Sequence, residues 1–409
     1  MYICCTTIQR TILLLLSLFL YACNEKSQDE TGYIDRDRLR SEALALAETW
    51  IEHAPTPGGF QKTLFDGIWQ PVGENSSVDL TAQSRLIYVY SAAYDLTGDK
   101  KYQQAARSAA DFMLHHMRNA ATGGWYKAVQ SDGTPIDDSV HPYGYSFTIF
   151  GLAHAYRVTG DRRFLEAAME TWQSNVWPGL KAAKLFAATG SISKKAGGNA
   201  WSQNPYMHLF EAMLALYDNT GSQEVWGDIE AMASFLRTTL IQPCGCIPEW
   251  FLGSGFEPQY GDNAEVYLGH QVEWAYLLSQ AVERGLDRDF LSVSYTLMDF
   301  AVDNGLNKDT GGLRAQSKMN GDIIDSNYWW WAQAELMRAA VHFARTHGRT
   351  ELWDVYEKSH LFARIHFINQ ELGGWTDSSL FLSKTTNQDL RQDIGYHAMG
   401  FYTEALTVK

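Results

Sequence analysis

Apolar residues recur along the chain at the spacing of one helix face, and the helices that they predict come in pairs. Three stretches share one plan, an apolar helix rich in small residues, a turn, and an amphipathic helix: YVYSAAYDLTGDKKYQQAARSAADFM, TIFGLAHAYRVTGDRRFLEAAMETW and HLFEAMLALYDNTGSQEVWGDIEAMASFL. Their turns hold Gly98, Gly160 and Gly221, each preceded by Thr and followed by Asp or Ser. Glycine suits the end of one helix and Asp or Ser the start of the next, so each stretch predicts a helical hairpin.

The hairpins repeat at a nearly fixed interval, because the three glycines are 62 and 61 residues apart and two weaker copies follow. A leading helix is expected over residues 38–52 and a short final helix over residues 396–407. Each of these is half of a pair, so they can complete one another if the array closes into a ring, whereas an open solenoid needs polar caps at both ends.

The repeat therefore predicts an all-α fold, a single (α/α)6 barrel of six helical hairpins over residues 37–409. Inner helices should begin near residues 80, 144, 205, 267, 328 and 395, with the other helices outside them. The motifs GGWY (123–126), GGLR and GGWT (373–376) recur after outer helices and predict short hairpins. No linker rich in Pro, Gly or Ser divides the 409 residues, so one domain is expected.

Charge and composition exclude one class of partner. The chain is 45% hydrophobic with a formal net charge of −14, and it has no run of Lys or Arg. Binding to nucleic acid depends on basic surfaces that match the phosphates, so no nucleic acid is expected as a partner.

The N-terminus has the pattern of an export signal. Arg10 precedes an apolar run over residues 11–21, which has the length of a signal-peptide core and is short for a membrane-spanning helix. The run ends in LYAC, which resembles a bacterial lipobox. We expect residues 1–22 to be removed, Cys23 to carry the lipid anchor, and residues 23–36 to form a polar tether at the membrane of the cell envelope. An ordinary cleavage site followed by an incidental cysteine is the alternative.

Cys244 and Cys246 are the two cysteines that follow Cys23. A C-x-C pair supplies too few ligands for a zinc site without partners, and a disulfide between them would close a very small ring. We expect them to be structural or incidental.

The period also aligns residues that can do chemistry. One position in the first turns of the inner helices is taken in order by Arg85, Phe147, His208, His270, Trp331 and His397, at intervals of 62, 61, 62, 61 and 66 residues. In a closed barrel these side chains would point to one end of one axis. A single helical histidine is usually a core residue, but three in one ring with an arginine predict a site.

Such a ring suits proton abstraction next to a carbonyl group. Helix N-termini disfavour imidazolium, which keeps histidines neutral and able to accept a proton. Arg85 can stabilise an oxyanion. The aromatic candidates for stacking on a sugar ring are Tyr143, Tyr145, Trp201, Trp274 and residues 329–331.

Three glutamates accompany the ring. Glu273 lies one turn after His270 and should hold its second nitrogen or bind a sugar hydroxyl. Glu335 and Glu211 have similar positions, and each of the three could instead form an ion pair or a helix cap. No metal is expected, because H-x-x-E lacks the H-E-x-x-H spacing and three histidines with a glutamate chelate only if they converge.

These residues occur in motifs that resemble the N-acylglucosamine 2-epimerase superfamily, which includes cellobiose 2-epimerases and mannose isomerases. The motifs are QSRLIYVYS with Arg85, NPYMHLFEA with Asn204 and His208, GHQVEW with His270, Glu273 and Trp274, WWWAQAE with Trp331 and Glu335, and GYHAM with His397. The resemblance covers nearly all of the chain after the signal peptide. It implies an (α/α)6 barrel and an enzyme that needs no cofactor.

The resemblance also implies a mechanism for epimerisation at C2 of a sugar. One histidine removes the C2 proton of the open-chain aldose, a cis-enediol forms, and a second histidine returns a proton from the other face; His270 and His397 would be this pair. Arg85 and His208 would polarise the reacting oxygens, and Glu273 would support His270. The residues implied to bind the substrate are Trp331, Glu335, Asn204, Tyr143 and Trp274.

The motifs leave the substrate open among mannose or glucose, an N-acylhexosamine and a β-linked disaccharide. WWWAQAE favours the epimerase branch, but GHQVEW is also close to the isomerase form, so aldose–ketose isomerisation is the nearest alternative. Glycoside hydrolysis by two carboxylates and non-catalytic glycan binding are further alternatives. Neither of these gives the histidines of the ring a role.

Overall fold

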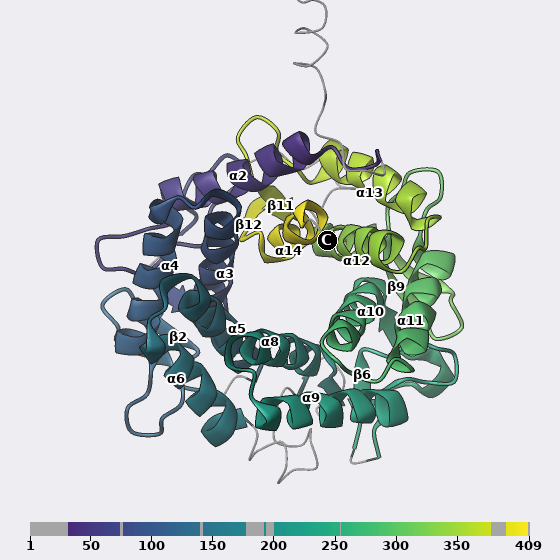
Figure 1. Cartoon of the computed structure of the whole chain (residues 1–409), viewed down its shortest axis with the longest axis horizontal. Helices are drawn as coiled ribbons and strands as arrows, with labels where there is room; N and C mark the ends of the chain where they lie inside the picture. The colour runs from purple at the N-terminus through teal and green to yellow at the C-terminus, as the bar shows by residue number, and fades with distance from the viewer. Residues whose placement is uncertain are drawn as a thin grey trace, which may run out of the picture.

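The computed structural model describes residues 32–73, 77–139, 142–176, 192–193, 200–253, 255–377 and 390–407. Within these ranges, helices form two concentric rings (Figure 1). The inner ring consists of α3 (Leu80–Thr97), α5 (Pro142–Thr159), α8 (Asn204–Thr220), α10 (Leu268–Glu283), α12 (Trp330–Thr346) and α14 (Tyr396–Leu406). The outer ring consists of α2 (Arg36–His53), α4 (Lys100–Phe112), α6 (Arg162–Glu170), α9 (Gln223–Phe235), α11 (Phe290–Gly305) and α13 (Leu352–His366).

The turns between paired helices have the conformation that the sequence predicts. Gly98, Gly160 and Gly221 end inner helices with φ angles of 70°, 68° and 59°, which glycine adopts without a steric penalty. The next outer helices are capped by the side chains of Asp99, Asp161 and Ser222, each of which accepts a backbone N–H of the first turn.

The ring closes between its first and last helices. In Figure 1 α2 and α14 lie side by side, although they are at opposite ends of the chain. Arg36 Nη2 donates to the carbonyl of Leu406 at 2.5 Å, and Trp50 Nε1 donates to the carbonyl of Asp393 at 3.0 Å. No inner helix begins more than two residues from its expected start, so the prediction of an (α/α)6 barrel is confirmed.

The two rings bury different amounts of their surfaces. Most residues of an inner helix are buried, because each inner helix packs against two inner neighbours and an outer partner. Outer helices bury one face, as α4 does with its tyrosine, alanines and phenylalanine. A polar side chain on an inner helix is therefore either inside the wall or aimed at the barrel axis.

Short strands cover one end of the barrel. The sheets have the orders β1-β2-β3, β4-β5-β6-β7, β10-β9-β8 and β11-β12. The strands are β1 (Ser77–Asp79), β2 (Ala128–Gln130), β3 (Pro135–Asp137), β4 (Ile192–Ser193), β5 (Ala200–Ser202), β6 (Trp250–Leu252), β7 (Glu257–Pro258), β8 (Glu265–Tyr267), β9 (Arg314–Lys318), β10 (Ile323–Tyr328), β11 (Trp375–Asp377) and β12 (Arg391–Asp393). Strands β1, β5, β8, β10 and β12 lead into inner helices, so the strands gather where the inner helices begin. The hairpins expected after the Gly-Gly motifs are present, since Trp125, Leu313 and Trp375 each bridge back to the end of an outer helix.

The predicted signal peptide, residues 1–22, and the predicted lipidation site, Cys23, lie outside the described residues. The predicted tether extends too far, because Ile34 is fully buried and Tyr33 stacks on Trp353 of α13 at 5.1 Å. Among the described residues no helix has both the length and the apolar character needed to cross a membrane.

Cys244 and Cys246 are joined by a disulfide, which agrees with a structural role.

Candidate active site

A cavity of about 350 Å³ opens at the strand-covered end, where the first turns of the inner helices meet. It is lined by Arg85, Tyr143, Asn204, His208, Tyr267, His270, Trp329, Trp330, Trp331 and His397. Five of the six residues that the period aligned are among them. The sixth, Phe147, is buried below, with its ring 4.4 Å from the guanidinium carbon of Arg85.

A carboxylate holds the imidazole of His270 from behind. Its Nδ1 lies 2.7 Å from Oε2 of Glu249, which also accepts from Gln203 Nε2 at 3.0 Å, while Oε1 accepts from Ser202 Oγ. Gln203 Nε2 also lies 2.9 Å from Nδ1, but the amide is oriented by Trp274 Nε1, which donates to its oxygen at 2.6 Å. Glu249 is therefore the acceptor for the Nδ1 proton. The other ring nitrogen of His270, Nε2, therefore keeps its lone pair, and the side chain lines the cavity.

His397 has an equivalent support from a different element. Its Nδ1 lies 2.8 Å from Oε1 of Glu335 on α12, and Oε2 of Glu335 accepts from Arg338 Nη1 at 3.4 Å. Burial and the nearby Arg85 charge lower the pKa of His397 well below the usual range, so its imidazole is neutral at neutral pH. The indole of Trp331 separates the two supported histidines, with ring centroids 4.8 Å from His270 and 5.6 Å from His397.

His208 is the third histidine of the cavity, and it is more isolated. Its Nδ1 is 3.5 Å from Glu211 and 3.8 Å from Glu273, the latter beyond hydrogen-bond distance. Burial lowers the pKa of His208 to about 4, although Glu211 opposes this shift. His208 is therefore neutral at the pH where His397 is neutral and can donate or accept a hydrogen bond.

Below the histidines lies a layer of three buried glutamates and one arginine. Burial and the charges of Glu335 and Glu211 raise the pKa of Glu273 well above its usual value, so Glu273 is a neutral acid. Burial also raises the pKa of Glu335, to about 7. Burial opposes ionisation of Glu211 too, but hydrogen bonding with His208 and the charge of Arg338 offset it and lower its pKa to about 2. The layer therefore releases one proton near neutral pH, from Glu335.

Arg85 supplies a fixed positive charge at the cavity wall. Nη2 donates to Tyr143 OH at 2.5 Å, and the guanidinium carbon lies 5.1 Å from the ring centre of Tyr396. Among the described residues, Arg85 Nε and Asn204 Oδ1 have no hydrogen-bond partner although both atoms are buried. Buried polar atoms are rarely left unpaired, so these two point to a polar ligand in the cavity.

The structure corrects three predicted roles. Glu273 does not hold His270, because it faces the barrel axis toward His208 while Glu249 occupies Nδ1 of His270. Glu335 does not line the cavity and supports His397 instead. Trp274 is fully buried and orients Gln203 rather than a substrate. Of the other aromatic candidates, Trp201 stacks on Phe251 inside the wall, and Tyr145 accepts from the backbone of Trp125, also away from the cavity.

Two overlapping groups could offer three ligand atoms to a metal ion: His208, Glu211 and Glu273, and Glu273, Glu335 and His397. Arg338 Nη1 lies 3.5 Å from Glu211 and 3.4 Å from Glu335. Its guanidinium already supplies the positive charge that this layer of carboxylates requires. The donor set is therefore better satisfied by the arginine than by a cation.

Comparison with known proteins identifies the family. The model of the N-acylglucosamine 2-epimerase family matches residues 58–400. The chain belongs to this family.

The individual relatives have low sequence identity to this chain, but each of them matches most of its length. It is 25% identical to the cellobiose 2-epimerase of Bacteroides fragilis over 69% of the chain and 76% of that protein. It is 24% identical to the D-mannose isomerase of Marinomonas mediterranea, over 78% of the chain and 83% of that protein. The solved cellobiose 2-epimerase of Bacillus thermoamylovorans B4167 superposes with a TM-score of 0.80 at 20% identity, covering 91% of this chain and 98% of that one.

These findings confirm three predictions made from the motifs: the family, the barrel, and an enzyme of the carbohydrate epimerase and isomerase class. The motifs did not identify Glu249 and Gln203, which come before inner helices and have no place in the helical period. Arg338 carried a usable signal, because it is a charged residue on the face of α12 that also presents Glu335.

Proposed function

We propose that the protein is a sugar 2-epimerase that acts on the reducing-end aldose through a cis-enediol. The observation that supports this most is the pair of histidines on either side of Trp331. Each has Nδ1 held by a carboxylate, Glu249 at 2.7 Å or Glu335 at 2.8 Å, and each lines the same cavity. A pair of bases that share one substrate site is what epimerisation requires, because the proton leaves one face of C2 and returns to the other.

The proposed steps conserve atoms and charge. Nε2 of one histidine takes the C2 proton, and the electrons of the C–H bond form a C1–C2 double bond while the carbonyl oxygen becomes an enediolate oxygen. Arg85 stabilises this oxygen, and His208 hydrogen-bonds to the neighbouring one. The second histidine, neutral at first, takes up a proton from water at the cavity and delivers it to the opposite face of C2, while the first histidine returns its proton to water. The imidazolium left by the first step is stabilised by its carboxylate.

The cavity wall and the names of the relatives support a hexose as the class of sugar. Trp329, Trp330, Trp331 and Tyr267 offer apolar ring faces, which suit the C–H faces of a hexose. The names of the relatives, cellobiose 2-epimerase and D-mannose isomerase, favour glucose or mannose at the reducing end, free or in a β-linked disaccharide. An N-acylhexosamine is the third candidate.

Aldose–ketose isomerisation is the second candidate function. It uses the same enediol and differs only in that the proton returns to C1, and relatives named D-mannose isomerase favour it. Glycoside hydrolysis needs two carboxylates at the substrate, and it is disfavoured because Glu273 and Glu335 are fully buried and do not line the cavity.

The function can be tested by incubating the mature chain in heavy water with glucose, mannose, N-acetylmannosamine, cellobiose or mannobiose. We expect NMR to show deuterium at C2 of substrate and product, and a 2-epimer as product. His270→Ala and His397→Ala should each slow exchange by at least about 10²-fold with the fold intact, and the exposed His115→Ala serves as a matched control. A ketose product would favour the isomerase, a split disaccharide would mean hydrolysis, and no exchange with any sugar would contradict both proposals.

We also propose that the protein is anchored in the cell envelope by a lipid on Cys23. The support is the sequence alone, from the apolar run and LYAC. When the chain is expressed in a bacterium with a lipoprotein pathway, wild type should take up labelled fatty acid and sediment with membranes. Cys23→Ser should do neither, and Cys246→Ser should behave as wild type in labelling. Unlabelled wild-type protein would contradict the anchor.

A further inference from the structure

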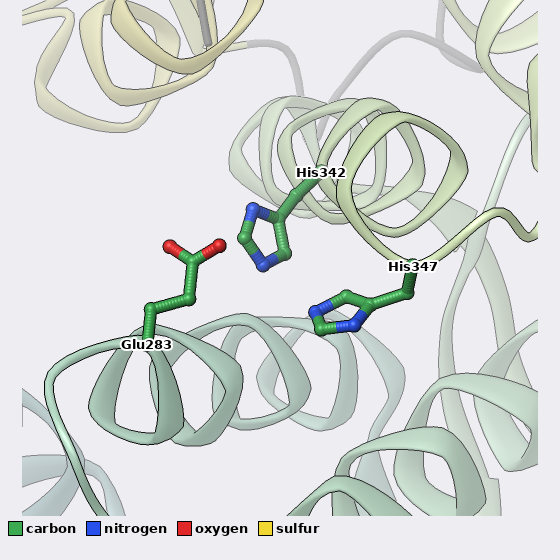
Figure 2. Close-up of side chains that lie close together, drawn as sticks. All are labelled: Glu283, His342 and His347. Carbon is green, nitrogen blue, oxygen red and sulfur yellow. The ribbon is translucent and has the colours of Figure 1, made fainter.

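A second group of ionisable side chains lies at the other end of the barrel, where the inner helices α10 and α12 finish. Glu283 is the last residue of α10, His342 lies just before the last turn of α12, and His347 is the C-cap of α12. Figure 2 shows the three side chains turned toward one another from these two helices, and one ligand atom of each lies within 4.8 Å of the others. None of the three lines the catalytic cavity.

His342 has the environment of a metal-binding histidine. It is fully buried, and its Nδ1 lies 3.2 Å from Oε1 of Glu404. Glu404 is held in turn by Arg345 Nη2 at 2.6 Å and by Tyr276 OH at 3.0 Å. A carboxylate on one ring nitrogen fixes the proton there and leaves the other nitrogen with a lone pair, which is the usual arrangement behind a metal-bound histidine.

The Nε2 atoms of the two histidines converge on the hydroxyl of Ser279. Nε2 of His342 is 2.8 Å and Nε2 of His347 is 2.7 Å from Oγ of Ser279. The serine hydroxyl therefore lies where an ion bound by both nitrogens would be. It can rotate away about χ1 or remain as an additional oxygen ligand. Glu283 follows Ser279 by one turn on the same face of α10, which brings its carboxylate to the same place.

The local backbone also favours a positive charge. Two helices end at this point, and the carbonyl groups of a helix C-terminus carry partial negative charge. The two arginines nearby already have acidic partners, since Arg284 pairs with Asp218 and Arg345 pairs with Glu404. A divalent cation would therefore add positive charge where the two helix ends meet.

We propose that Glu283, His342 and His347 bind a divalent transition metal of the Zn²⁺ class, which clamps the end of α10 to the end of α12. Two imidazoles and a carboxylate are a common zinc ligand set, and the serine hydroxyl or water completes the coordination. The site is structural. It stabilises two neighbouring inner helices at the end of the barrel remote from the chemistry.

The test compares Zn²⁺ binding by the metal-free protein and its variants, with equilibrium dialysis followed by elemental analysis. His347→Asn and Glu283→Gln are chosen because both residues are partly accessible, and His366→Asn, at the end of α13, is the matched control. Any Zn²⁺ held by the catalytic histidines is common to all these proteins. We expect wild type and His366→Asn to bind about one more equivalent than the other two.

Thermal unfolding provides a second, independent measurement. Zn²⁺ should raise the Tm of wild type and of Ser279→Ala. It should raise the Tm of His347→Asn and Glu283→Gln much less, because a ligand that binds the folded state more tightly stabilises it more. All variants should have wild-type circular dichroism in EDTA. Equal Zn²⁺ binding by wild type and His347→Asn would overturn the proposal. So would a Tm shift that is lost in Ser279→Ala and kept in His347→Asn.

Discussion

At the scale of single residues, the carboxylate behind each catalytic histidine decides what that histidine can do. Glu249 accepts hydrogen bonds from Ser202 and Gln203 in addition to His270. Glu335 instead belongs to the buried layer with Glu273, where burial raises its pKa to about 7. Glu335, the carboxylate that supports His397, therefore changes its own charge near neutral pH.

This gives a prediction for the pH dependence of catalysis. As pH rises through about 7, Glu335 loses its proton and becomes an anion that stabilises the imidazolium of His397. Burial keeps the pKa of His397 well below this range, so His397 itself does not titrate there. We expect kcat/KM for C2 exchange to fall as pH is lowered below about 7, by up to about tenfold per pH unit.

Glu335→Gln tests whether Glu335 is the source of this limb. The amide does not titrate, so the variant should lose the acidic limb between pH 5 and 8 and should lower kcat by about 10²- to 10⁴-fold. The control is Glu257→Gln on β7, an exposed glutamate that should leave profile and rate unchanged. An acidic limb that persists in Glu335→Gln with the same midpoint would assign it to another group.

How far single residues can be predicted depends on whether they follow the helical period. Arg85, His208, His270, Trp331 and His397 could be found because the period determines which side of an inner helix faces the axis. The period does not say which neighbour a side chain will meet. For this reason Glu273 was expected at His270, whereas it faces the barrel axis and the other glutamates.

At the scale of elements, the distance between inner helices is set where α10 and α12 begin. Gly269 lies in the first turn of α10, and a Cβ there would come within 2.5 Å of the ring of Trp331 and 2.7 Å of Cβ of Ala332. This close approach brings His270 against Trp331. The glycine is therefore required by packing rather than by backbone conformation.

Gly269→Ala should destabilise the protein by about 1–3 kcal/mol, the typical cost of overpacking, and should slow C2 exchange because Trp331 is displaced. Gly227→Ala is the matched control, since Gly227 lies inside α9 and its Cβ would meet no atom within 4 Å. There alanine should stabilise by about 0.5–1 kcal/mol through helix propensity. Urea unfolding and exchange rates measure both. Wild-type stability of Gly269→Ala would refute the packing argument.

At the scale of the whole molecule, the barrel has no structural beginning. The fold could be predicted because equal spacing of hairpins, together with half a pair at each end, has few solutions other than a ring. The strand-covered end was less predictable, because strands of two to six residues leave little periodic signal. The loops there carry Glu249 and Gln203, so the part of the fold that was hardest to predict also holds the missed site residues.

A closed ring predicts that the position of the chain ends matters little. Arg36 of α2 contacts the carbonyl of Leu406 directly, so a short Gly-Ser linker can join Thr407 to Tyr33. New ends between Gly221 and Ser222 would fall in the turn from α8 to α9, and Ser222 would still cap α9. We expect this permutant to fold with wild-type circular dichroism and to keep C2 exchange within a few-fold of wild type, because exposed turns tolerate new termini.

A control permutant opened between Leu277 and Leu278, both buried in α10, should not fold. If opening the exposed turn also abolishes folding, the hairpins do not form an unbroken ring of equivalent units, and the seam between α2 and α14 depends on the natural order of the chain.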